Sequence, residues 1–256
     1  MNNTFNLNRF GRLFVKHTVE HYKSYLMSLT VLMVVMILGG SFLVYMIEIP
    51  IDRGFQSAIF VMILLLAGSI FTSTIFADFG DKKKAVASLT LPASHFEKYL
   101  VAWIYSFLIF LVVYTIGFYL VALFAVNVKH FPGHIIEVIN VFEQPVCEMY
   151  LLYAFLHAIV FFGAIFFEKL HFIKTAFIFF ISLAILILIN KLFLSALLGR
   201  EVVPTALFGN LRFTEKGNTV DINITQAQEP YLLTLITVLA IIFWVAAYYR
   251  LKEKQV

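Results

Sequence analysis

Residues 77–98 read ADFGDKKKAVASLTLPASHFEK and lie between two long apolar runs. Near the end of this segment, Ser94 is followed three residues later by Glu97. This spacing is typical of a capping box, in which both side chains satisfy free backbone N–H groups at the start of a helix. We therefore expect a helix to begin near His95. Pro92 separates it from the charged part of the loop, where Asp81 is a candidate cap for a shorter helix.

The composition indicates a membrane protein. Of the 256 residues, 61% are apolar and 13% are charged, whereas about 25% of the residues of a soluble domain are charged. The single cysteine, Cys147, excludes an intramolecular disulfide and a multi-cysteine metal site. The net charge of +4 is distributed between the apolar runs, which is the membrane pattern and not that of a nucleic-acid-binding face.

Six segments are long and apolar enough to cross a bilayer, because a helix needs about 20 apolar residues to span a core of about 30 Å. The sequence thus predicts an all-α integral membrane protein with six transmembrane helices in a domain over residues 25–249. The six predicted spans are Tyr25–Ile47, Ser57–Phe76, Tyr99–Val126, Met149–Phe167, Phe172–Ile189 and Tyr231–Tyr249.

The distribution of basic residues predicts the orientation. With the N-terminus in the cytoplasm, 13 of the 19 Lys and Arg residues lie on the cytoplasmic side, as the positive-inside rule requires. Both termini are then cytoplasmic, residues 250–256 form a cytoplasmic tail, and residues 127–148 and 195–230 are extracellular segments.

Residues 1–24 have the pattern of an amphipathic helix. At about 100° per residue, Phe10 and Phe14 share one face, while Arg12 and Lys16 share another. A basic stripe opposite aromatic residues predicts an interfacial helix on an anionic membrane leaflet. The alternative is an ordinary cytoplasmic helix that packs on the loops.

The third predicted helix is longer than a membrane requires. From His95 to Val126 it has 32 residues, about 48 Å at 1.5 Å per residue. It must tilt, or its first turns must project into the cytoplasm. A rigid helix that starts in the 77–98 loop can carry motion from that loop into the membrane.

The two extracellular segments have different patterns. Val220 and Ile222 alternate with polar residues, which predicts a strand, and Leu211–Thr214 is the candidate partner in a hairpin over residues 211–225. Pro132, Gly133 and Pro145 flank Ile135–Phe142, for which we expect a short surface helix.

The histidine pair His17 and His21 and the single histidine His157 are candidate sites. His17 and His21 have the H-x-x-x-H spacing of metal ligands, but they continue the Phe10–Phe14 line, so we favour aromatic-like residues at the membrane interface. His157 is the only Asp, Glu, His, Lys or Arg residue deep in a predicted span. It is a possible intramembrane polar site, but we favour a neutral histidine hydrogen-bonded to a serine or threonine of a neighbouring helix.

Catalytic motifs are absent from the sequence. Gly68-Ser69 and residues 72–74 supply hydroxyl groups without a G-x-S-x-G motif, and together with Gly163 they are typical of close helix packing. No G-x-x-x-x-G-K-[ST] run is present, so the chain lacks a P-loop. No carboxylate lies in the middle of a predicted span, which argues against an ion-coupled carrier. We expect the chain not to be an enzyme.

Together these features resemble the permease subunit of type-2 ABC transporters. The most specific match is Leu91–Lys98, which is similar to the L-P-x-S-x-x-E run that opens the third helix of many such permeases. By architecture the resemblance covers the whole chain: an N-terminal helix, six spans, a structured second cytoplasmic loop and an element between the last two spans.

The resemblance implies an ATP-driven exporter of an apolar or amphipathic substrate in the inner membrane of a bacterium. Its partners would be an ABC ATPase subunit, which binds ATP and Mg, a second permease subunit and the lipid bilayer, with no nucleic acid. The chain itself would bind no cofactor and no metal. The open alternative is a non-transporting membrane assembly or sensor subunit. The residues implied in coupling are Asp81, Lys82, Lys83, Lys84, Leu91, Pro92, Ser94 and Glu97.

Overall fold

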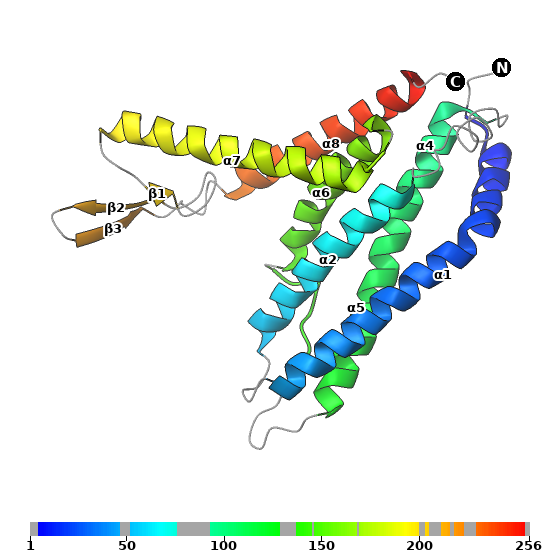
Figure 1. The fold of residues 1–256 in the computed structure, drawn as a ribbon, viewed down its shortest axis with the longest axis horizontal. Coiled ribbons are helices and arrows are strands. Elements are labelled where there is room, and N and C mark those ends of the chain that lie inside the picture. Colours follow the sequence, from blue (N-terminus) through cyan, green and yellow to red (C-terminus); the bar gives the residue numbers. More distant parts are fainter. Residues whose placement is uncertain are drawn as a thin grey trace.

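The structure is a computed structural model composed mainly of long helices, with three short strands at one side (Figure 1). It describes residues 5–46, 52–75, 93–128, 137–144, 146–167, 169–199, 203–204, 211–215, 218–222 and 229–253.

Within these ranges, six helices are long and apolar enough to cross a membrane, which confirms the predicted number of spans. The third of them is continuous but has three parts, with a π-helical segment, η2, between two α-helical ones. The helices are α1 (Leu7–Met46), α2 (Arg53–Ile75), α4 (His95–Trp103), η2 (Ile104–Ile109), α5 (Phe110–Val128), α6 (Val146–Phe166), α7 (His171–Leu198) and α8 (Glu229–Glu253).

The helices define two ends of the bundle (Figure 1). We call the end at which α1 and α4 begin and α8 ends the capped end. The opposite end, where α2 begins and residues 137–144 lie, is called the loop end.

Helix α1 joins the predicted N-terminal helix and the first predicted span in 40 continuous residues. Nothing between Lys23 and Tyr25 ends a helix, because this stretch has neither glycine nor proline. Figure 1 shows α1 bent, with its first turns at an angle to the rest. The Thr18 hydroxyl donates a hydrogen bond to the Phe14 carbonyl over 2.8 Å, a contact that favours bending.

The predicted start of the third helix is confirmed. Ser94 precedes α4 with an extended backbone, and its hydroxyl accepts a hydrogen bond from the Glu97 backbone N–H at 3.2 Å. The Glu97 carboxylate in turn accepts one from the Ser94 backbone N–H at 2.9 Å. Both halves of the predicted capping box are therefore present. The π-helical segment farther along was not predicted.

Helix α6 is the central helix and contacts α2, α7 and α8. Two glycines allow this close packing. A Cβ atom at Gly68 would lie 2.3 Å from Cε2 of Tyr153, and one at Gly163 would lie 2.0 Å from Oγ1 of Thr175. The interpretation of these small residues as packing positions is confirmed.

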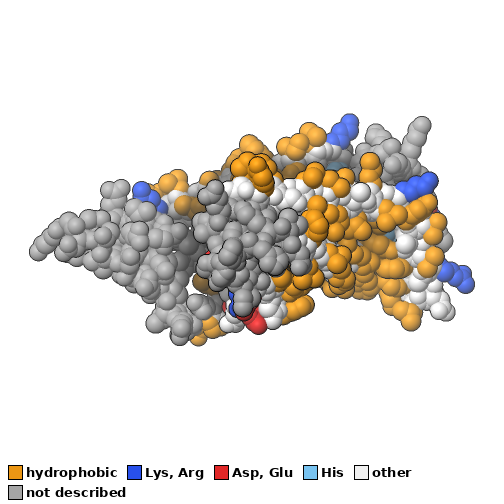
Figure 2. Space-filling model, turned by 90° about the horizontal axis from the view of Figure 1, so that it is seen from below, with side chains coloured by type: hydrophobic (Ala, Val, Ile, Leu, Met, Phe, Trp, Pro, Cys, Tyr) orange, Lys and Arg blue, Asp and Glu red, His pale blue; other side chains and the backbone are white. Residues whose placement is uncertain are grey.

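Helices α1 and α7 are the least buried of the six long helices. Helix α7 projects away from the other helices (Figure 1) and exposes large apolar side chains such as Phe177 and Phe180. Figure 2 shows a face of the molecule on which hydrophobic side chains form a continuous area with Lys and Arg side chains at its margins. Helix α7 continues nine residues beyond the predicted Ile189, through Lys191, and ends at Gly199 with φ 62°, a left-handed conformation typical of a helix end.

The predicted hairpin is confirmed for residues 211–215 and 218–222, while residues 216–217 lie outside the described residues. Strand β2 (Leu211–Glu215) pairs antiparallel with β3 (Asn218–Ile222), with Phe213 opposite Val220. A third strand, β1 (Val203–Pro204), pairs with the other edge of β2 and was not predicted. Residues 223–225 of the predicted hairpin lie outside the described residues.

Residues 137–144 are not helical, so the predicted surface helix is wrong for this stretch. Ile139 and Val141 are buried instead. Gln56 binds the backbone of the segment: its amide nitrogen donates to the Glu137 carbonyl at 3.0 Å, and its amide oxygen accepts from the Ile139 N–H at 3.1 Å. Because apolar side chains enter the bundle and backbone groups bond to side chains, a helical ladder does not form.

Candidate functional site

Two helices begin next to each other at the capped end. Asn6 caps α1, because its side-chain oxygen accepts hydrogen bonds from the backbone N–H groups of Asn8 at 3.0 Å and Arg9 at 3.2 Å. Ser94 caps α4 in the same manner. The first N–H groups of both helices lack partners within their own helix, and α1 contacts α4 here.

The Glu97 carboxylate serves the starts of both helices. One oxygen, Oε2, accepts from the Ser94 backbone N–H at 2.9 Å, and the other, Oε1, accepts from the Asn6 backbone N–H at 2.9 Å. A glutamate at this position usually bonds only to the cap residue of its own helix. Here it also bonds to the cap residue of α1. Since helix N-termini carry partial positive charge, the position favours an anion.

Arg9 completes this arrangement with two further bonds to the same carboxylate. Its Nε lies 2.7 Å from Oε2, and its Nη2 lies 2.7 Å from Oε1. This bidentate geometry is the strong form of an ion pair. The Glu97 side chain has no exposed surface, while that of Arg9 is 31% exposed. Four N–H donors thus converge on one buried carboxylate. We call Glu97, Arg9, Asn6 and Ser94 the Glu97 node.

Aromatic rings extend the contact between α1 and the third helix. Phe10 lies next to Phe14, with ring centroids 6.2 Å apart, and Phe14 stacks on Tyr105 of η2 at 4.9 Å. Phe5 contacts Phe96 of α4 at 6.0 Å. Phe10 and Phe14, which the sequence assigned to a membrane-facing surface, therefore contact rings of their own chain.

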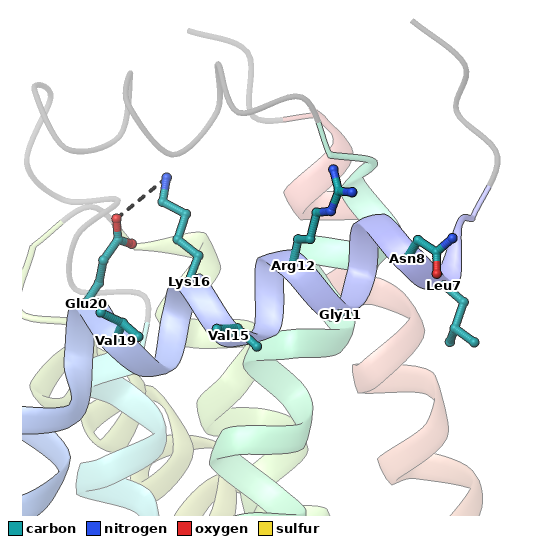
Figure 3. Close-up of a pocket in the computed structure, with 8 residues that line it drawn as sticks. All are labelled: Leu7, Asn8, Gly11, Arg12, Val15, Lys16, Val19 and Glu20. Carbon is teal, nitrogen blue, oxygen red and sulfur yellow. Dashed lines mark ion pairs between the residues drawn. The ribbon is translucent and has the colours of Figure 1, made fainter.

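The opposite face of α1 is open to the outside. Its side chains line a shallow depression (Figure 3), in which Arg12 and Lys16 point to one side and Lys16 pairs with Glu20 at 3.6 Å. Exposed apolar side chains accompany these charges, so this face is amphipathic. The lining residues are Leu7, Asn8, Gly11, Arg12, Val15, Lys16, Val19 and Glu20.

His17 and His21 lie in the aromatic contact between α1 and η2. Their ring centroids are 4.5 Å apart, and His17 packs against Tyr105 at 4.9 Å. Nε2 of His17 lies 2.6 Å from the Tyr25 hydroxyl. Both rings therefore pack as aromatic side chains do. Across the described ranges, no group of three potential metal-binding side chains is present.

His157 is buried and takes part in a chain of hydrogen bonds across three helices. Trp244 Nε1 lies 3.1 Å from His157 Nδ1, and His157 Nε2 lies 2.9 Å from the Ser106 hydroxyl. An indole N–H only donates, so Nδ1 is the acceptor and a neutral ring carries its proton on Nε2. His157 then donates to Ser106, and Ser106 donates to the Ala102 carbonyl at 2.8 Å.

These hydrogen bonds confirm the interpretation of His157 as a histidine bonded to a serine of a neighbouring helix. Because His157 donates to the Ser106 hydroxyl, it is not arranged to remove a proton from it. Trp244 was missed as a partner of His157, because the two residues lie 87 positions apart in the chain.

The structure brings together only part of the predicted coupling set. Ser94 and Glu97 belong to the Glu97 node. The Glu97 side chain is buried and bonds to the starts of two helices. The remaining predicted coupling residues lie outside the described ranges; they are Asp81, Lys82, Lys83, Lys84, Leu91 and Pro92. Arg9 and Asn6 were missed, because a partner 88 or 91 residues away leaves no pattern in a single sequence.

No family model, curated protein or solved structure matches this chain.

Proposed function

We propose that the chain is the membrane-spanning permease subunit of an ATP-driven exporter and works with separate ATPase subunits. Six apolar helices supply a membrane domain. The third helix begins at a capping box whose cap residue, Ser94, lies two positions after Pro92. The partner ATPase binds ATP and Mg, and this chain supplies the path for an apolar or amphipathic substrate.

The Glu97 node is the observation that carries this proposal. It joins the first turn of α1 to the first turn of α4 through one buried carboxylate. Force applied to the chain just before Ser94 therefore acts on both helices together. The third helix runs from His95 to Val128, about 50 Å at 1.5 Å per residue, and is long enough to carry such a displacement across a bilayer core of about 30 Å.

The proposal places the capped end at the cytoplasmic side of a bacterial inner membrane, since basic residues favour that side. The outer face of α1, with Arg12 and Lys16, then lies at the anionic lipid headgroups. A second permease subunit covers part of the exposed apolar surface, for which α7 offers Phe177 and Phe180.

The first test is purification of the tagged chain from its native membrane in a mild detergent. The proposal expects a P-loop ATPase in stoichiometric amounts, and ATP hydrolysis by the complex in liposomes. Purification without any P-loop ATPase would contradict the proposal and favour the non-transporting assembly or sensor subunit.

The second test concerns coupling within that complex. Reversing the charges of Lys82, Lys83 and Lys84 to Glu is expected to reduce ATP hydrolysis and ATPase retention. Arg53→Glu is the matched control, because Arg53 is a basic residue of the loop end that pairs with Glu137 on the surface. An equal loss in both variants would mean that the lysines have no special role in coupling.

A further inference from the structure

The third helix contains a π-helical segment that its own sequence does not require. Residues 104–109 read IYSFLI, with neither proline nor glycine. A π segment contains one residue more than the corresponding α-helical turn, and such segments are often found at functional positions. Because the local sequence contains no helix breaker, the surrounding helices must stabilise the π form.

Side chains of α6 supply this stabilisation at Ser106. The Tyr153 hydroxyl donates to the Ser106 backbone carbonyl at 3.2 Å, and His157 bonds to the Ser106 hydroxyl at 2.9 Å. The Ser106 hydroxyl donates to the Ala102 carbonyl. Trp244 of α8 fixes the orientation of His157. The Ser106 carbonyl within the π segment and the Ala102 carbonyl two residues before it therefore both accept hydrogen bonds from side chains.

Conversion of this segment to an α-helix would change the position of α4. Each residue of an α-helix corresponds to a turn of about 100° and a rise of about 1.5 Å. If the extra residue were absorbed into α-helical turns, α4 would rotate by about 100° relative to α5. Glu97 would then leave Arg9, because both bonds of that pair need the present orientation of α4.

We propose that residues 104–109 form a two-state segment that switches between π and α and thereby rotates α4 about its own axis. The Glu97 node stabilises the π state from the capped end, and Ser106 with His157 stabilises it from within the bundle. The switch rests on contacts within this chain and does not depend on an ATPase partner. It gives α4 two positions relative to the rest of the bundle.

The test measures the position of α4 in the full-length protein in lipid nanodiscs. Spin labels are attached at F96C in α4 and L170C in the turn between α6 and α7, both exposed positions, with Cys147→Ser as background. The distance between the labels is measured by double electron–electron resonance. Glu97→Gln removes the charge and keeps the side-chain shape. We expect it to raise the population of a second distance roughly tenfold, the size expected for loss of a charged hydrogen bond.

Deletion of Leu108 distinguishes a π-to-α conversion of residues 104–109 from simple fraying of the start of α4. Leu108 is exposed, and its removal turns the π segment into a regular α-helix while α4 and α5 keep their present contacts. The second distance should disappear in Glu97→Gln combined with this deletion and persist in Glu97→Gln combined with Leu108→Ala. A second distance that survives the deletion, or a single unchanged distance in Glu97→Gln, would overturn the proposal.

Ser106→Ala gives an independent reading if the deletion variant does not fold. It acts within η2, away from the Glu97 node, and should populate the same second distance as Glu97→Gln. A different second distance, or none, would show that the two positions do not stabilise one common state.

Discussion

The capped end and the loop end each use one buried polar side chain to bind the backbone of a distant segment. At the loop end, the neutral amide of Gln56 donates to the Glu137 carbonyl and accepts from the Ile139 N–H. At the capped end, the Glu97 carboxylate accepts from the Asn6 and Ser94 N–H groups and also pairs with Arg9.

The difference lies in the charge. The Gln56 amide matches one donor and one acceptor and leaves no net charge behind when the contact opens. A carboxylate without exposed surface depends on its cation, because an unpaired buried charge is strongly unfavourable. Opening the Gln56 contact at the loop end would therefore expose no unpaired charge. Separating the first turns of α1 and α4 at the capped end would leave the Glu97 carboxylate without Arg9. Four substitutions test this comparison.

Glu97→Ala should have the largest effect. It leaves the N–H groups of Asn6 and Ser94 and the Arg9 guanidinium without their common acceptor. We expect the free energy of unfolding to fall by about 3 kcal/mol, the upper end of the range for a lost hydrogen bond to a charged group. Thermal unfolding in detergent measures the change. A loss no greater than that of Gln56→Ala would refute the distinction between the ends.

Arg9→Gln should have the next largest effect, because it leaves the buried carboxylate without its cation. Adding Glu97→Gln to Arg9→Gln should restore part of the lost thermal stability, since the double variant no longer buries a charge. The two single variants and the double variant form a double-mutant cycle. Strictly additive losses in melting temperature would show that the two side chains do not interact.

Gln56→Ala should be milder and confined to the loop end. It removes two neutral hydrogen bonds, each worth about 0.5–1.5 kcal/mol, so we expect a loss of about 2 kcal/mol in unfolding free energy, the middle of the summed range. Hydrogen exchange should increase in residues 137–144 and remain unchanged at the start of α4. Increased exchange at both ends would show that the two regions are not independent.

Arg53→Ala should have the smallest effect. Arg53 pairs with Glu137 at the loop end, but both side chains are more than half exposed, and exposed ion pairs contribute about 0–1 kcal/mol. The melting temperature should therefore change little at either low or high salt. A loss comparable to that of Arg9→Gln would show that charge pairing stabilises both ends equally.

The sequence predicted the local features of the capped end correctly. Ser94 and Glu97 are three residues apart, so the capping box and the start of the third helix could be recognised without tertiary information. The pairing of Arg9 with Glu97 could not be recognised, because 88 residues separate the two. The π segment was also invisible, because IYSFLI has the composition of any apolar helix.

The helix predicted for residues 135–142 was wrong for a similar reason, since tertiary contacts decide the structure of that segment. Ile135–Phe142 was expected to form a surface helix, but Ile139 and Val141 are buried, and Gln56 bonds to the backbone of Glu137 and Ile139. The predicted domain boundary between residues 24 and 25 rested on a change in composition, and α1 continues through it, because a helix ends only where its backbone hydrogen bonds end.

By itself, the sequence determined the six apolar helices, the capping box, the β2–β3 hairpin and the glycines at close helix contacts. These depend on hydrophobic length, on spacings of a few residues and on side-chain size. Only the tertiary structure decided that Glu97 also caps α1, that Arg9 neutralises it and that α6 stabilises a π form at Ser106. Each of these contacts joins residues far apart in the chain, and packing alone determines which of them meet.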